Sequence, residues 1–125
     1  MRVSLFKGTF DTTELKSVNV FSVFKDIETE KYKHLIAKVR LIVDDTERNE
    51  LKRNILPLVT FGGTFTNRAN SALKKSSGLA ILDYDHVPDL KKLIAEVNND
   101  NFTFASFVSP SGDGLKVLVK IPPVS

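Results

Sequence analysis

The sequence predicts an α+β fold, because helical and strand-like patterns both recur along the chain and the strand-like ones gather in its second half. The N-terminal third has mostly helical spacing of its apolar residues. After it, short apolar runs alternate with helical segments, and the chain closes with two strands joined by a tight loop. We therefore expect a small, mostly antiparallel sheet with helices packed on one face.

The individual elements follow from the spacing of apolar residues and from the positions of glycine and proline. A weak alternation at the N-terminus predicts a short strand, and Ser17 is the expected N-cap of the first helix. The acidic start of the third helix suits the helix dipole, and Pro57 ends helical character. The expected order is a strand at 1–8, helices at 17–29, 30–43 and 44–54, a strand at 58–61, a polar helix at 67–75, a buried strand at 79–85, a helix at 88–98, an interior strand at 102–109 and a last strand at 115–121.

Length and composition limit the classes of protein that the chain can represent. Its 125 residues make one domain, and the absence of cysteine excludes disulfides and thiolate metal sites. No apolar run approaches the roughly 20 residues that a membrane span needs. Without a signal-like start, we expect an intracellular, cytoplasmic protein that has no membrane partner. The net charge of +3 permits an anionic partner without requiring one.

Two carboxylates end the apolar run from Gly78 to Asp85. Side chains alternate along a strand, so Asp83 and Asp85 are expected on the same face, roughly 6–7 Å apart. Like charges at that spacing repel, and Mg²⁺ or Mn²⁺ between them would relieve the repulsion. The alternative interpretation is a pair of solvated acids that close a strand before a turn.

A second group of functional residues lies between the last two expected strands. Gly112 and Gly114 allow left-handed backbone, and such a turn can point successive N–H groups inward around an anion. Ser109 and Ser111 add hydroxyl donors, and Lys116 adds a positive charge. Together they would cradle a triphosphate. The alternative is an ordinary hairpin loop whose residues serve turn geometry alone.

The two groups complement each other chemically. Cations that bridge carboxylates and phosphates are characteristic of nucleotidyl-transfer sites. If the strand at 115–121 neighbours the strand at 79–85, Lys116 will lie over the face that carries Asp83 and Asp85.

These motifs together resemble a known family, the VirE N-terminal domains of Bacteroides-type mobile elements, a branch of the archaeo-eukaryotic primase superfamily. The resemblance rests on Leu56–Pro57, Phe61–Phe65, Gly78–Val87 and Phe107–Val117. It implies a primase-like core of the RRM type. It further implies a primase-polymerase-like nucleotidyltransferase that acts in DNA replication of a mobile element.

The resemblance also implies roles for matched residues. Asp83 and Asp85 match the element that holds catalytic Mg²⁺ or Mn²⁺, and the segment from Ser109 to Lys116 matches the nucleotide-binding element. The expected partners are a nucleoside triphosphate and a DNA template, either single-stranded or primer-template. The chain departs from the superfamily in having Lys116 where histidine is general. A third acidic motif normally follows on a later strand, whereas this sequence stops nine residues after Lys116, and Asp113 at a loop tip replaces it poorly. We therefore expect a fragment of a longer protein.

Other polar residues have two interpretations each. Arg68, Lys74 and Lys75 would contact a nucleic-acid backbone, or they form a solvated helix face. His86 would support a metal ligand, or it is a boundary residue before Pro88.

Two further functions remain open at this point. One is a catalytically silent nucleic-acid-binding module on the same fold, in which the acids and the loop are structural. The other is a TOPRIM-type metal site, which also uses two acids at a strand end but needs an upstream catalytic glutamate that the sequence does not provide convincingly.

Overall fold

The computed structural model describes residues 1–8, 11, 14–66 and 73–121. In chain order the elements are β1 (Arg2–Phe6), β2 (Lys16–Asn19), α1 (Val20–Glu28), α2 (Lys33–Arg40), α3 (Asp45–Ile55), β3 (Leu58–Thr60), β4 (Gly63–Phe65), β5 (Leu73–Ser76), β6 (Leu79–Tyr84), α4 (Leu90–Asn98), β7 (Thr103–Val108) and β8 (Leu115–Lys120). Helices combined with antiparallel sheets confirm the predicted α+β class.

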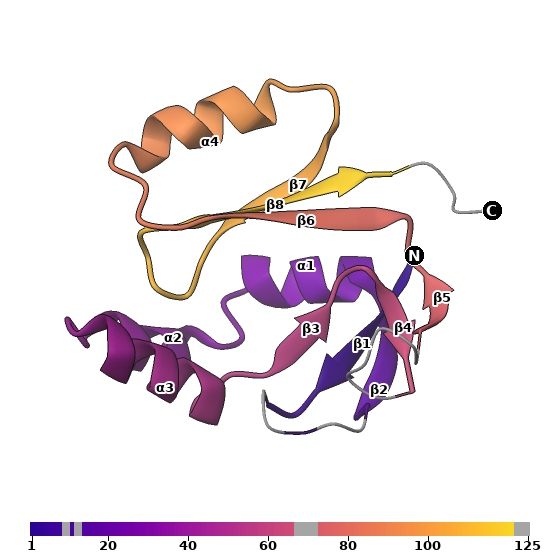
Figure 1. Cartoon of the computed structure of the whole chain (residues 1–125), viewed down its shortest axis with the longest axis horizontal. Helices are drawn as coiled ribbons and strands as arrows, with labels where there is room; N and C mark the ends of the chain where they lie inside the picture. Colours follow the sequence, from indigo (N-terminus) through magenta and orange to yellow (C-terminus); the bar gives the residue numbers. More distant parts are fainter. Residues whose placement is uncertain (9–10, 12–13, 67–72, 122–125) are drawn as a thin grey trace.

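The strands of the described residues form small sheets with the orders β2-β1-β3, β4-β5 and β6-β8-β7, and the pairings are antiparallel. Figure 1 shows α4 above the β6-β8-β7 sheet and α1 below it. The loop between β7 and β8 reaches down beside α2 and α3. The β7–β8 loop, α2 and α3 therefore meet at this end of the sheet.

Helices α1, α3 and α4 begin where polar side chains accept hydrogen bonds from free backbone N–H groups. Asn19 accepts from the N–H of Phe21 at 2.9 Å, and Asp44 accepts from that of Glu47 at 2.9 Å. Asp44 thus confirms the expected acidic start of the third helix. Ser17 as N-cap is wrong, because the segment before Asn19 pairs with β1 as strand β2.

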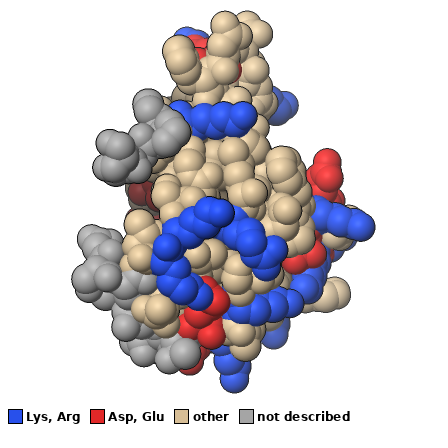
Figure 2. Space-filling model, turned by 90° about the vertical axis from the view of Figure 1, so that its right-hand side faces the viewer, with Lys and Arg blue, Asp and Glu red and all other residues tan. Residues whose placement is uncertain are grey.

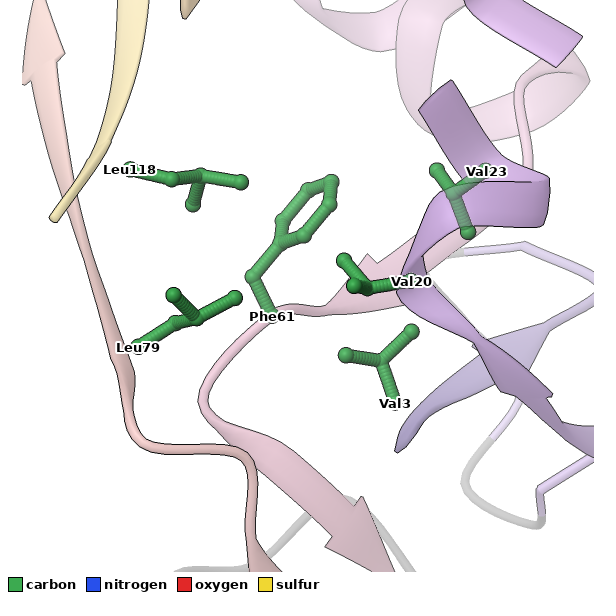
Figure 3. Close-up of a cluster of buried hydrophobic side chains, with 6 residues drawn as sticks. All are labelled: Val3, Val20, Val23, Phe61, Leu79 and Leu118. Atoms are coloured by element: carbon green, nitrogen blue, oxygen red, sulfur yellow. The ribbon is translucent and has the colours of Figure 1, made fainter. Parts of the chain in front are cut away.

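A cluster of buried side chains joins the last sheet to the N-terminal half. Figure 3 shows Phe61 between two groups of aliphatic residues. Leu79 and Leu118 come from the β6-β8-β7 sheet, and three valines come from β1 and α1, namely Val3, Val20 and Val23. The Phe61 ring also lies 5.8 Å from that of Phe107, centroid to centroid. This cluster fixes the N-terminal half against the face of the sheet that carries the predicted site.

Two expected interior strands are edge strands instead. In the β6-β8-β7 sheet the central strand is β8, and β6 is buried at Leu79 but exposed from Ile81 onward. All six residues of β7 are half-buried. The reason is pairing: β8 comes last in the chain and inserts between β6 and β7, so that each of them has one strand neighbour in this sheet. An apolar run alone does not show how many neighbours a strand has.

Two further expectations need correction. The predicted polar helix at 67–75 is wrong at its C-terminal end, where Leu73–Ser76 pairs with β4 as strand β5; residues 67–72 lie outside the described part of the chain. Helices also cover both faces of the last sheet, because Phe21 and Phe24 of α1 contact Phe104 on the face opposite α4 (Figure 1).

Candidate nucleotide and metal site

The expected contact between the acidic strand end and the loop lysine is present. Asp83 on β6 pairs with Lys116 on β8, and the Lys116 ammonium donates a hydrogen bond to Asp83 Oδ1 at 2.8 Å. Directly opposed residues in an antiparallel pair project from the same face. Lys116 therefore lies over the face that bears Asp83, as the sequence predicted. Asp85 follows the last residue of β6 by one position.

The loop from Ser109 to Gly114 is closed by its own backbone. The Ser109 N–H donates to the Gly114 carbonyl at 3.0 Å, and the Gly112 N–H donates to the Ser109 carbonyl at 2.9 Å. Gly112 has a φ of 89°, which a side chain would strain. A Cβ at Gly114 would lie 2.6 Å from the carbonyl oxygen of Tyr84, so only glycine allows the loop to approach β6 this closely. The Gly112 N–H is thus used inside the loop.

Cations from two helices hold the outer side of this loop. Arg40 of α2 donates to the carbonyls of Pro110 and Ser109, each at 3.3 Å. Lys52 of α3 donates to the Ser111 hydroxyl at 3.2 Å. Sequence reasoning missed these helix cations. For Lys52, helical spacing offered a signal of a basic helix face, because Lys52 and the neighbouring cation Arg48 lie four residues apart and so share one face of α3.

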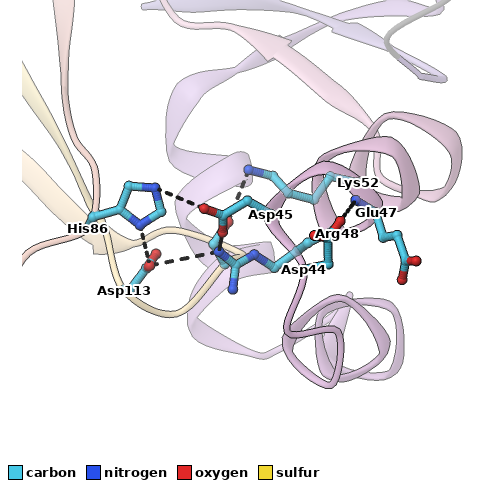
Figure 4. A network of polar contacts seen from close by, with 8 residues as sticks. Asp44, Asp45, Glu47, Arg48, Lys52, His86 and Asp113 are labelled. Carbon is cyan, nitrogen blue, oxygen red and sulfur yellow. Dashed lines mark hydrogen bonds and ion pairs between the residues drawn. The ribbon is translucent and has the colours of Figure 1, made fainter.

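A polar network ties α3 to the ends of the strands (Figure 4). His86 Nδ1 lies 2.8 Å from Asp113 Oδ2, and its Nε2 lies 3.7 Å from Asp45 Oδ2. Arg48 pairs with Asp45 and lies 3.9 Å from Asp113. Asp113 therefore belongs to this network, although the sequence placed it at a loop tip. His86, with a φ of 51°, reaches Asp113 rather than a carboxylate of the Asp83 and Asp85 pair.

The Lys52 ammonium lies in surroundings that disfavour its positive charge. Burial lowers the pKa of Lys52, and the charge of Lys116 lowers it further. Asp85 and Asp113 act in the opposite direction, while Arg48 adds to the lowering. The net lowering of the pKa means that the charged form of Lys52 is disfavoured here, first by burial and then by the neighbouring cations.

Two cavities adjoin the site, and Lys52 lines both. The larger is an open cleft of about 1170 Å³ with mostly apolar walls, which include Ile81 and Phe107, and Lys116 also lines it. The smaller has a volume of about 200 Å³ and polar walls, which include Asp85 and Ser111. The arrangement offers an apolar space and a polar space with cationic groups between them.

The chain matches a known protein family. The family described as "BT4734-like, N-terminal domain" matches residues 50–123, more than half of the chain. The chain belongs to this family. The match covers Lys52, the acidic strand end and the whole loop. Neither the search of curated proteins nor the search of solved structures found a match.

The carboxylates of this BT4734-like domain fit a divalent cation only with help from other ligands. Among the described residues, no three His, Asp or Glu side chains gather closely enough to hold a metal ion. Asp83 already holds the Lys116 ammonium. Mg²⁺ commonly takes one or two carboxylates and completes its shell with water and phosphate oxygens. In a site of that kind, Asp83 and Asp85 would be the two carboxylate ligands.

The predicted nucleic-acid contacts lie on another side of the domain. Lys74 and Lys75 are exposed on β5, and Lys74 Nζ lies 3.4 Å from Glu14 Oε1. Figure 2 shows an arc of Lys and Arg side chains on the side of the molecule where β5 lies, away from α2 and α3. Arg68 lies outside the described residues. In the part of the chain that the structure describes, no helix is long and apolar enough to cross a membrane.

Proposed function

We propose that this domain binds a nucleoside triphosphate and Mg²⁺ or Mn²⁺ as a primase-polymerase-like nucleotidyltransferase, acting on DNA in replication of a mobile element. The observation that carries the proposal is the 2.8 Å contact of Asp83 with Lys116, a residue that lines the apolar cleft. It brings a phosphate-binding group and a metal-binding group together. The motif resemblance to VirE N-terminal domains supports the same function.

The ion pair between Lys116 and Asp83 is suited to exchange. The two side chains are 29% and 48% exposed, and ion pairs with such access to water contribute roughly 0–1 kcal/mol. A phosphate therefore replaces Asp83 on Lys116 at little cost. Asp83 is then free, with Asp85, to bind a cation. When bound, that cation would neutralise charge on the phosphates during transfer.

Nucleotide binding should depend strongly on Lys116. We expect Lys116→Ala to weaken binding of a nucleoside triphosphate with Mg²⁺ by about 10- to 100-fold, as for the loss of a hydrogen bond between charged groups. Isothermal titration calorimetry measures this, and Lys92→Ala on α4 is the control because it removes an exposed charge elsewhere. Equal affinities of wild type and Lys116→Ala would refute the proposal.

The basic side that carries β5 would hold the DNA backbone. Each phosphate contact contributes a slope of about −0.7 to −0.9 to the dependence of log affinity on log salt concentration. We expect Lys74→Ala/Lys75→Ala to make the slope shallower by about one per lysine. Fluorescence anisotropy with a labelled primer-template over a salt series measures the slope. An unchanged slope would remove both lysines from the interface.

One observation favours a second function, a catalytically silent nucleic-acid-binding module. The Lys116 ammonium neutralises Asp83 in the described structure, as a purely structural ion pair would. Such a module would bind the primer-template with the same salt dependence but would show no saturable binding of nucleoside triphosphate. The calorimetric experiment therefore separates the two functions.

A further inference from the structure

We infer that Lys52 of α3 is a second phosphate-binding cation of the nucleotide site and holds the terminal phosphates of the ligand. The inference rests on the proposed function, because it concerns the same ligand. It adds a helix that sequence reasoning did not connect with the site.

The position of Lys52 between the two cavities is the first support. Its side chain lines the apolar cleft and the small polar cavity, and its ammonium donates to Ser111 of the loop at 3.2 Å. The small cavity, at about 200 Å³, is below the roughly 300–1,000 Å³ of pockets that hold drug-sized ligands. That volume leaves room for phosphate groups but not for a whole nucleotide, and the walls carry Lys52 and Arg48 beside three aspartates. A nucleoside in the cleft would thus direct its phosphates past Lys52.

The charges around Lys52 give the second reason to infer that it binds phosphate. It faces the cations Lys116 on β8 and Arg48 on its own helix, and the carboxylates Asp85 after β6 and Asp113 in the loop. Burial and the Lys116 charge together outweigh the carboxylates, as the lowered pKa shows. An anion between Lys52 and Lys116 relieves the repulsion of the two ammonium groups. Phosphate has the charge and the oxygen acceptors for both.

Inorganic tripolyphosphate without metal is the probe that isolates this contact. We expect Lys52→Met to weaken its binding by about tenfold or more, because one charged hydrogen-bond donor is lost. Lys52→Arg should stay within about threefold of wild type, because it keeps a charged donor. Lys92→Met on α4 is the matched control and should bind like wild type. Thermal unfolding of each variant checks that it folds.

If Lys52 contacts the bound anion directly, binding should also be accompanied by proton uptake. An anion beside Lys52 raises its pKa again, so binding should take up protons over the pH range in which the Lys52 ammonium of the free protein loses its proton. Calorimetry in two buffers of different ionisation enthalpy measures the uptake, which Lys52→Met should reduce. If Lys52→Met matches wild type in affinity and uptake while Lys116→Ala loses binding, the inference is wrong and the proposed function stands. If wild type itself does not bind tripolyphosphate or a nucleoside triphosphate, the proposed function fails and the inference with it.

Discussion

Replacing Phe61 by alanine should lower the free energy of unfolding by about 3–5 kcal/mol, the usual cost of removing a buried aromatic ring. The Phe61 side chain is 9% exposed and lies in the buried cluster that joins the last sheet to β1 and α1 (Figure 3). Its removal leaves a cavity between two groups of aliphatic side chains, and neither group can close the cavity without moving a sheet or a helix.

Urea unfolding followed by circular dichroism measures this loss. Val43→Ala is the control, because Val43 is 92% exposed and its truncation should change stability by no more than about 0.5 kcal/mol. A loss below about 1 kcal/mol for Phe61→Ala would show that the buried cluster does not hold the two halves together.

Much of the fold could be predicted from local sequence signals. The helix that begins at Asp45 has an acidic cap, Asp44, and an acidic first turn, and both are visible in the sequence. The strand at Leu115–Lys120 has only apolar residues at every second position from Leu115, whereas both of its lysines fall on the other face, which is typical of a strand with two different faces. Such elements are fixed by residues close together in the chain.

Other features depend on partners that are distant in the sequence. The run that starts at Leu79 is apolar enough for a central strand, yet β8 occupies the centre and β6 the edge. Leu73–Ser76 has the composition of a solvated helix and becomes a strand because β4 pairs with it. Long-range pairing decided both cases, and no local propensity reports it.

In the candidate site, too, some features could be predicted from the sequence, whereas others depend on contacts between distant segments. The opposition of Asp83 and Lys116 could be predicted on the condition that their strands are neighbours, because both residues belong to recognisable motifs, and the pairing of β6 with β8 meets that condition. The contribution of Lys52 could not, because α3 is separated in sequence from the loop that it contacts. Helical spacing placed Arg48 and Lys52 on one face, but nothing local showed what that face meets.

The double substitution Asp83→Asn/Asp85→Asn should abolish Mn²⁺ binding at the site. Asparagine keeps the shape of aspartate but removes its charge, and a divalent cation needs at least one anionic ligand here because the nearby Lys116 and Lys52 repel it. The loss should be a complete disappearance of saturable binding in the millimolar range. A single substitution should weaken binding by tens-fold, as is common for a lost metal ligand or supporting contact.

Paramagnetic NMR with Mn²⁺ tests the central claim most directly, because it reports where the cation lies. In wild type, millimolar Mn²⁺ should broaden the backbone amides of residues 83–86 and 109–116 first, and the broadening should vanish in Asp83→Asn/Asp85→Asn. A nucleoside triphosphate added with Mn²⁺ should extend the broadening to the amides around Lys52. Broadening spread evenly over the surface acids, and equal in wild type and the double variant, would contradict a nucleotide and metal site at this end of the sheet.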